Sequence, residues 1–136
     1  MKLASLIILS LSTFLFACSS EPAAKTQLIQ MQDLQQQWHL VSIDNKTVET
    51  ESNLKIDDKA SATGNLACNN FFGTLELQAN KLRIDKMGST RKMCEPALND
   101  IEMIVSSTLS GWSKAAISDN QLTISGEKHT LIYAIK

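Results

Sequence analysis

The 136-residue chain contains little of several residue types that known functions require. It has two histidines, two prolines and three cysteines, and aromatic residues make up only 5% of it. The formal net charge of −1 leaves no basic surplus for gripping phosphates, so we expect no nucleic-acid partner. Hydrophobic residues at 43% are too frequent for a disordered chain, and the length fits one folded domain.

Motifs for catalysis and for cofactor binding are missing as well. The sequence contains no Gly-x-Ser-x-Gly nucleophile elbow, no phosphate-binding loop and no dinucleotide fingerprint. The alternation of apolar residues places His39 on the polar face of one strand and His129 at the start of another, opposite Ile124. A position at the solvent-exposed edge of the sheet accounts for each histidine without a catalytic role. We therefore predict no enzyme activity, no catalytic residue and no cofactor.

The N-terminus has the pattern of an export signal. Lys2 is followed by the mostly apolar stretch from Leu3 to Ala17, and the next charge is Glu21. This stretch is shorter than the roughly 20 residues that a membrane-spanning helix needs. A positive charge, a short apolar region and a small residue at its end are typical of a secretory signal peptide, which we assign to residues 1–17.

Cys18 directly follows this signal. The segment from Leu15 to Cys18 resembles the bacterial lipobox, in which the cysteine is acylated and becomes the new N-terminus. The resemblance implies lipidation at Cys18, a linker over residues 18–34 and a folded domain over residues 35–136. Because Ser19 rather than an acidic residue follows the cysteine, we expect a lipid anchor in the outer membrane, facing the periplasm. A plain signal peptide with an incidental cysteine is the alternative.

The folded part is predicted to begin with antiparallel hairpins. A turn at Ala79 and Asn80 brings alternate apolar residues to one face, because it pairs Leu77 with Leu82. The same register pairs Leu75 with Ile84. Asn80 tolerates the left-handed backbone that such a turn requires. Weaker strand patterns cover residues 38–43, and a weaker hairpin covers residues 54–56 and 60–63.

Two more hairpins are predicted at the C-terminus. Turns at residues 119–120 and 126–127 pair Leu122 first with Ile117 and then with Leu131. Both registers bring apolar side chains to one face across three strands, as a half-buried sheet requires. We therefore expect a three-stranded meander at the end of the chain.

Residues 96–110 carry the pattern of one amphipathic helix. Pro96 suits the first turn, and Gly111 is a natural terminator. A single such helix cannot bury its face alone, so we predict an α+β fold, in which an open, barrel-like antiparallel β-sheet of hairpins wraps around the helix. Trp112, just past the helix, is expected to plug the core. Residues at helical spacing form the predicted buried stripe: Leu98, Ile101, Ile104, Val105, Thr108 and Leu109.

Cys68 and Cys94 flank the hairpin of residues 73–86, which returns the chain to the end where the two can meet. Disulfides persist in exported proteins, and acylation of Cys18 leaves one pairing. We therefore predict a disulfide between Cys68 and Cys94, with two free buried thiols as the alternative.

We expect no metal. A soft copper site, the weaker alternative, would use three methionines with Cys94: Met87, Met93 and Met103.

The stretch from residue 64 to residue 73 is unusual, because two asparagines follow a cysteine and precede two phenylalanines. Such a pattern suggests an irregular crossing between strands. Asn69 is expected to satisfy buried backbone groups there. The alternative is a ligand-facing lip in which Phe71 or Phe72 is exposed.

Two motifs, at residues 64–73 and 90–94, together resemble the signature of the META domain family over roughly residues 35–136. The resemblance implies a barrel-like antiparallel sheet wrapped on a helix, an association with the heat-shock response and novobiocin resistance, and no established catalytic activity. The residues that match the family's motifs are expected to have a structural role only: Gly64, Cys68, Asn69, Phe71, Gly73, Thr90 and Cys94.

Taken together, these features predict a non-enzymatic, lipid-anchored envelope protein. A small barrel on a short tether is suited to meeting an unidentified envelope protein partner at the membrane surface. A binder of small apolar ligands in the open end of the barrel is the main alternative, and it requires a cavity lined by apolar side chains. An enzyme is the third possibility, and it requires a pocket that holds a hydrogen-bonded nucleophile and base.

Overall fold

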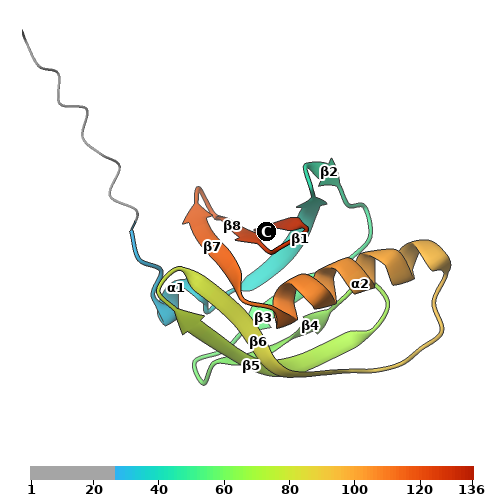
Figure 1. Ribbon diagram of the computed structural model, residues 1–136, viewed down its shortest axis with the longest axis horizontal. Coiled ribbons are helices and arrows are strands. Elements are labelled where there is room, and N and C mark those ends of the chain that lie inside the picture. The colour runs from blue at the N-terminus through green and yellow to red at the C-terminus, as the bar shows by residue number, and fades with distance from the viewer. Residues whose placement is uncertain (1–26) are drawn as a thin grey trace, which may run out of the picture.

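The computed structural model describes residues 27–136 (Figure 1). The signal peptide, the lipidation site Cys18 and the first part of the linker lie outside the described residues. The elements follow one another in this order: α1 (Met31–Leu34), β1 (Gln37–Ile43), β2 (Lys46–Thr47), β3 (Asn53–Ile56), β4 (Ser61–Asn65), β5 (Asn70–Gln78), β6 (Lys81–Ser89), α2 (Pro96–Ser110), β7 (Ser113–Ser118), β8 (Gln121–Ser125) and β9 (Thr130–Ala134).

All nine strands belong to one antiparallel sheet, in the order β2-β1-β3-β4-β5-β6-β7-β8-β9. An additional pairing between β1 and β9 closes eight of these strands into a barrel, and β2 extends β1 as a short hairpin. The predicted α+β fold, a barrel-like antiparallel sheet with one amphipathic helix, is confirmed, but the barrel is closed and not open as predicted, because β1 also pairs with β9. Closure leaves few unpaired strand edges, which otherwise invite pairing with other chains.

The predicted registers of two hairpins are confirmed. Leu77 faces Leu82 across the β5–β6 turn, and Ile117 faces Leu122 across the β7–β8 turn. The role given to Asn80 was wrong, because Ala79 takes the positive φ of 52° in that turn. The Asn80 side chain instead binds the segment that precedes α1, as described below.

The predicted register of the third hairpin was wrong by two residues. Leu122 faces Tyr133 rather than Leu131, and Ile124 faces Leu131 rather than His129. The connection between β8 and β9 therefore spans four residues instead of two. A shift by two keeps the same side chains on the buried face, because side chains alternate with a period of two. His129 consequently lies in the loop and not within a strand.

The sheet is splayed between β6 and β7. These strands pair only at Lys81 with Lys114 and at Leu82 with Ser113, although β6 continues to Ser89. Helix α2 connects the two strands (Figure 1), and it packs against β6, β8 and β9. Its bounds agree with the predicted helix. Only the C-terminal half of its stripe is fully buried, at Val105, Thr108 and Leu109.

The barrel has one continuous apolar core, to which both helices and every strand except β2 contribute. At one end, Leu34 of α1 is fully buried and its carbonyl accepts a hydrogen bond of 3.0 Å from the indole of Trp38. The β5–β6 and β7–β8 turns lie at this same end. We call it the α1 end. The opposite end, where β4 meets β5 and β8 meets β9, carries α2, and we call it the α2 end. No helix among residues 27–136 has the length and apolar character needed to span a membrane.

Tyr133 carries a polar group into this core. Its side chain is fully buried, and its hydroxyl has no hydrogen-bond partner among the described residues. Burial raises the pKa of this hydroxyl well above its ordinary value, because the phenolate would lose its hydration. The group is therefore neutral at every physiological pH.

Replacing Tyr133 by phenylalanine is expected to stabilise the protein. The substitution removes a buried hydroxyl that has no partner and keeps the ring that fills the core, so the free energy of unfolding should rise by about 1 kcal/mol. Urea denaturation of the wild type and of Tyr133→Phe measures the difference. A loss of stability would mean that the hydroxyl has a partner, such as a buried water.

Candidate functional site

The structure brings the two sequence motifs together at the α2 end of the barrel. Residues 64–73 form the end of β4, the β4–β5 connection and the start of β5. Residues 90–94 lie in the segment between β6 and α2. A disulfide joins Cys68 to Cys94 across them, with the two Cα atoms 6.2 Å apart. The bond ties the start of α2 to the strand connection on the other side of the β5–β6 hairpin.

Asn69 is the centre of a hydrogen-bond network in this region. Its side chain is almost fully buried, and its Oδ1 accepts hydrogen bonds from the backbone N–H of Lys92 at 2.7 Å and from the hydroxyl of Thr90 at 2.9 Å. The same hydroxyl accepts a hydrogen bond from the backbone N–H of Asn70 at 3.1 Å. An amide is suited to this position because it offers donors and acceptors on one rigid group.

Glu102 of α2 completes the network, and sequence reasoning did not single it out. The backbone N–H of Asn69 donates to its Oε2 at 2.9 Å, and the side-chain Nδ2 of Asn69 donates to its Oε1 at 3.1 Å. Hydrogen bonds to an ionised acceptor are stronger than neutral ones. The second turn of α2 is therefore fastened to the β4–β5 connection 33 residues earlier in the sequence.

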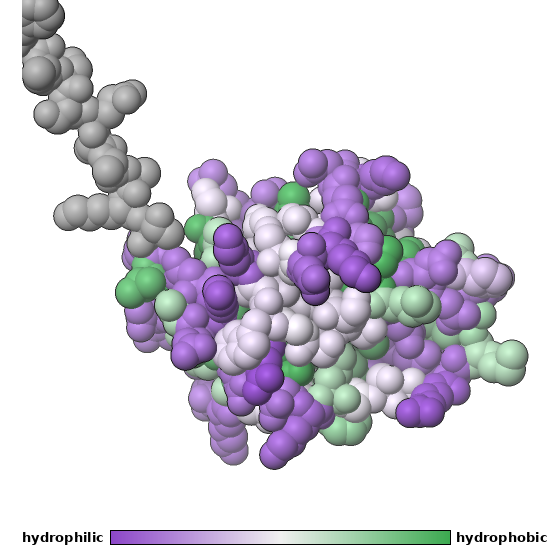
Figure 2. All heavy atoms as spheres, in the orientation of Figure 1, coloured by the Kyte–Doolittle hydropathy of each residue, from purple (hydrophilic) through white to green (hydrophobic). Residues whose placement is uncertain are grey.

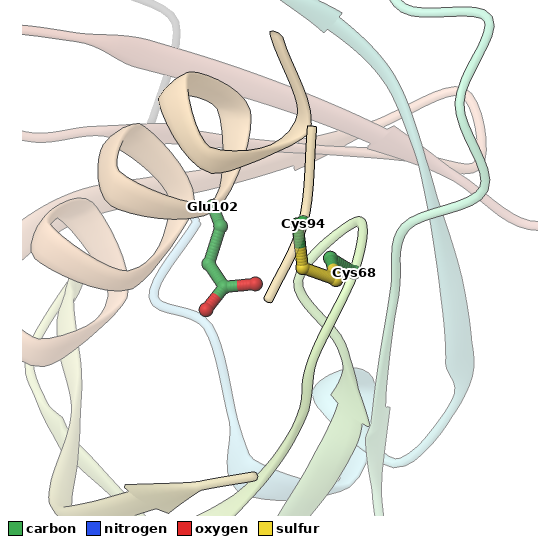
Figure 3. A group of neighbouring side chains, drawn as sticks. All are labelled: Cys68, Cys94 and Glu102. Carbon is green, nitrogen blue, oxygen red and sulfur yellow. A yellow bond between two sulfur atoms is a disulfide. The ribbon is translucent and has the colours of Figure 1, made fainter. Parts of the chain in front are cut away.

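Figure 3 shows Glu102 pointing from α2 toward the two cysteines. The Cys68 and Cys94 sulfurs and a Glu102 carboxylate oxygen lie within 4.8 Å of one another, a spacing that could hold a metal ion. The disulfide consumes both thiolates, which are the form of cysteine that ligates metals. In the oxidised protein this cluster therefore serves to hold the loop and the helix together.

Two glycines of the signature lie where a side chain has no room. A Cβ on Gly64 would overlap the backbone carbonyl of Asn53 on β3, and it would come within 2.8 Å of the Phe71 ring. A Cβ on Gly73 would overlap the side chain of Ile84, at the irregularity in the β5–β6 register. Both glycines permit the close strand approach that curves the sheet.

The two phenylalanines of the motif have different environments. Phe71 is buried in the core, whereas Phe72 is 62% exposed and its ring lies over Gly88 on the outer face of the barrel. The expectation that Trp112 plugs the core was wrong. Trp112 is 43% exposed, and the guanidinium carbon of Arg83 lies 4.9 Å from the centre of its ring. This cation–π contact holds the indole on the surface.

A groove of about 670 Å³ runs between α2, the end of β6 and the β8–β9 loop. Apolar side chains from three different parts of the chain contribute to its lining, together with polar groups. We call this surface the α2 groove. Its lining includes Leu66, Met87, Met103, Ile104, Lys128 and His129.

Hydrogen bonds to Asp44, in the β1–β2 turn, hold the His129 part of the α2 groove in place. His129 Nδ1 lies 2.7 Å from an Asp44 carboxylate oxygen, and the backbone N–H of Thr130 donates to the other oxygen at 2.8 Å. The hydrogen bond with His129, followed by that from Thr130, holds the pKa of Asp44 below its ordinary value. These contacts explain the four-residue β8–β9 loop, because they attach it to the β1–β2 turn.

Several polar groups of the α2 groove are engaged in structural contacts. The hydroxyls of Ser106, Ser107 and Ser110 donate to backbone carbonyls of α2 three residues earlier. His129 pairs with Asp44, and none of these serines is hydrogen-bonded to it within residues 27–136. A nucleophile–base pair requires such a bond. The arrangement offers a surface for recognition.

The comparisons with known proteins agree with this geometry. The sequence matches the META domain over residues 30–136, a range that contains both motifs and α2. The chain belongs to the META domain family. It is 28% identical, over 138 aligned residues, to the heat shock protein HslJ of Escherichia coli strain K12, and the alignment covers 98% of this chain and 95% of that protein.

Two structures solved by NMR have the same fold. One is 28% identical in sequence, has a TM-score of 0.70 and corresponds to 79% of this chain and 95% of that one. The second, a protein from Burkholderia xenovorans, is 19% identical, has a TM-score of 0.63 and covers 99% of this chain and 97% of that one. At this low identity the second structure shows the fold alone.

Asn69→Ala is expected to lower the free energy of unfolding by about 3 kcal/mol, because it removes bonds to a carboxylate and leaves the part-buried N–H of Lys92 without its partner. Asn70→Ala is the matched control. Asn70 is exposed, and its side chain accepts one hydrogen bond from Asn65, so the loss should stay below about 1 kcal/mol. Chemical denaturation measures both. Equal losses would contradict the central role of Asn69.

Reducing the disulfide is expected to lower the free energy of unfolding by about 3.5 kcal/mol, because the bond closes a loop whose ends are 26 residues apart. The variant Cys68→Ser/Cys94→Ser should show the same loss without reductant. Thiol titration of the folded, exported protein provides the direct measurement. Two titratable thiols in the absence of reductant would disprove the bond.

Proposed function

We propose that this protein is a lipid-anchored envelope protein that acts without catalysis, by binding an envelope protein partner in the α2 groove. Membership of the META domain family, which is not known as an enzyme family, supports the absence of catalysis. The lipobox-like segment before Cys18 and the serine that follows it support an acyl anchor in the outer membrane, facing the periplasm.

The observation that carries this proposal is the exposed apolar side chain of Met103 on a helix that is rigidly held. Met103 is 68% exposed, and Ile104 beside it is only half-buried. The disulfide and the bonds between Asn69 and Glu102 fix α2 without covering this surface. A fixed apolar surface loses little entropy on binding, which favours recognition of a partner.

The molecular surface is consistent with a localised contact. Figure 2 shows hydrophilic residues over much of the visible face, with hydrophobic residues in separate small patches. Some of these patches lie at the right, where Figure 1 places the first turns of α2. An exposed apolar patch among polar residues is typical of a protein-binding site.

We further propose that this contact serves the response to heat or envelope stress and contributes to novobiocin resistance. The similarity to the heat shock protein HslJ along nearly the whole chain supports the first part. The association of the family with novobiocin resistance suggests the second. A protein that acts by contact needs no cofactor, in agreement with the structural roles of the polar groups in the α2 groove.

A second candidate function is the binding of small apolar ligands in the same groove. The volume of about 670 Å³ and the side chains of Leu66, Met87 and Met103 favour this candidate, since ligand sites of this size are lined mostly by apolar groups. Novobiocin itself would then be one ligand to test.

Met103→Asp is expected to abolish function without unfolding the protein, because it places a charge in the apolar part of the groove at an exposed position. In a strain that lacks the gene, the wild type should restore novobiocin tolerance and growth at high temperature, and Met103→Asp should not. Met93→Asp is the matched control, because Met93 is fully exposed and lies outside the α2 groove. Equal complementation by both variants would contradict the proposal.

Calorimetric titration of the purified protein with novobiocin separates the two candidates. Saturable binding that Met103→Asp removes would favour the ligand-binding function. No heat, together with failed complementation by the same variant, would favour the protein partner.

A further inference from the structure

A pair of lysines lies on the outer face of the barrel at the β6–β7 junction. Lys81 and Lys114 occupy directly opposite positions on the two strands, and both are exposed. Their neighbours in the same cross-strand row are Gln78 on β5 and Ser125 on β8, which carry no charge. Like charges directly opposite each other destabilise a sheet, so the stability of the fold does not explain why two lysines occupy these positions.

The next row on this face holds Arg83 and Trp112. The positive charge of Arg83 is matched by acids, since its Nε lies 2.6 Å from Glu76 and its guanidinium lies 3.5 Å from Asp85. The two lysines differ from it in this respect. Among residues 27–136, no carboxylate lies within ion-pair distance of Lys81 or Lys114. The face therefore combines two unneutralised ammonium groups with an exposed indole.

The chain leaves the domain beside the same junction. The backbone N–H of Ile29 donates to the Asn80 side chain at 2.9 Å, and Asn80 Nδ2 donates to the Gln27 carbonyl at 3.4 Å. Asn80 immediately precedes Lys81 in the β5–β6 turn. The segment toward Cys18 thus begins next to the lysine pair, at the α1 end of the barrel. Gln27 lies nine positions after Cys18, so the domain can lie at most about 30 Å from an anchor at that cysteine.

A shallow hollow of about 570 Å³ lies between the lysines and the β7–β8 hairpin. Ala79, Ala115 and Ala116 contribute to its lining, so no large side chain blocks it. Tryptophan is enriched at membrane interfaces, and lysines are attracted to anionic lipid headgroups. Charge, aromatic character and the position of the tether therefore favour one kind of partner.

We propose that the outer face of β6 and β7 lies on an anionic phospholipid surface, with Lys81 and Lys114 contacting headgroup phosphates and Trp112 reaching the interface. The proposal rests on the proposed function, because it concerns the membrane that holds the anchor. It places the side of the barrel formed by β6 and β7, next to the point where the tether leaves the domain, against the bilayer.

Tryptophan fluorescence of the full-length, lipidated protein in vesicles tests this orientation. Trp38 is 1% exposed and cannot meet lipid, so quenching by brominated acyl chains reports on Trp112. In vesicles of phosphatidylethanolamine and phosphatidylglycerol, we expect strong quenching. In vesicles of phosphatidylcholine, most of the quenching should be lost. Trp112→Phe supplies the signal of Trp38 alone.

Lys81→Gln/Lys114→Gln is expected to lose the quenching in anionic vesicles while remaining folded, and even to gain stability because the repulsion is relieved. Lys55→Gln/Lys59→Gln is the matched control, because these exposed lysines lie on and after β3, which is opposite β7 in the ring. Quenching that is equal in both lipids, or unchanged by the first double variant, would overturn the proposal.

Flotation of the same preparation with the vesicles and its intact mass test the lipid anchor. Quenching of Trp112 tests the membrane contact. A protein that floats with the vesicles and carries acyl mass on Cys18, but shows no quenching of Trp112, overturns the membrane contact alone. A protein that neither floats nor carries acyl mass overturns the lipid-anchored function, and the membrane contact with it.

Discussion

The short pairing between β6 and β7 is the constraint around which the molecule is arranged. These strands share two residue pairs, and the rest of β6 would present unpaired backbone groups to solvent. Helix α2 packs along this region, but only Val105, Thr108 and Leu109 of its side chains are buried. Bonds from Asn69 to Glu102, together with the disulfide, supply what burial does not. The attachment of α2 over this part of the sheet and the exposed apolar side of the helix therefore both follow from the short pairing between β6 and β7.

Much of this architecture could be predicted from alternation and helical spacing. The hairpins around residues 79–80 and 119–120 have local turns and apolar residues at matching offsets, so their registers follow from the sequence alone. The helix bounds follow from Pro96 and Gly111 in the same way. In each case the deciding interactions lie within a few residues of one another.

The features that sequence reasoning missed depend on distant contacts. A β8–β9 register shifted by two residues buries the same side chains, so alternation cannot distinguish the two registers. The pairing of His129 with Asp44, 85 residues away, favours the longer loop. Glu102 resembled an ordinary charge near the start of a helix, and only its position beside Asn69 gives it a role. Trp112 was misjudged because its partner, Arg83, lies on another strand.

Closure of the ring by β1 and β9 has a consequence for how the protein is made. The first barrel strand pairs with the last, so a chain that emerges N-terminus first exposes an unsatisfied β1 edge until its final residues are free. Partly emerged chains are therefore most prone to aggregation just before β9 has emerged, and chaperones would be needed at that stage. Loss of only the last strand would leave the whole sheet open, however well the remaining hairpins form.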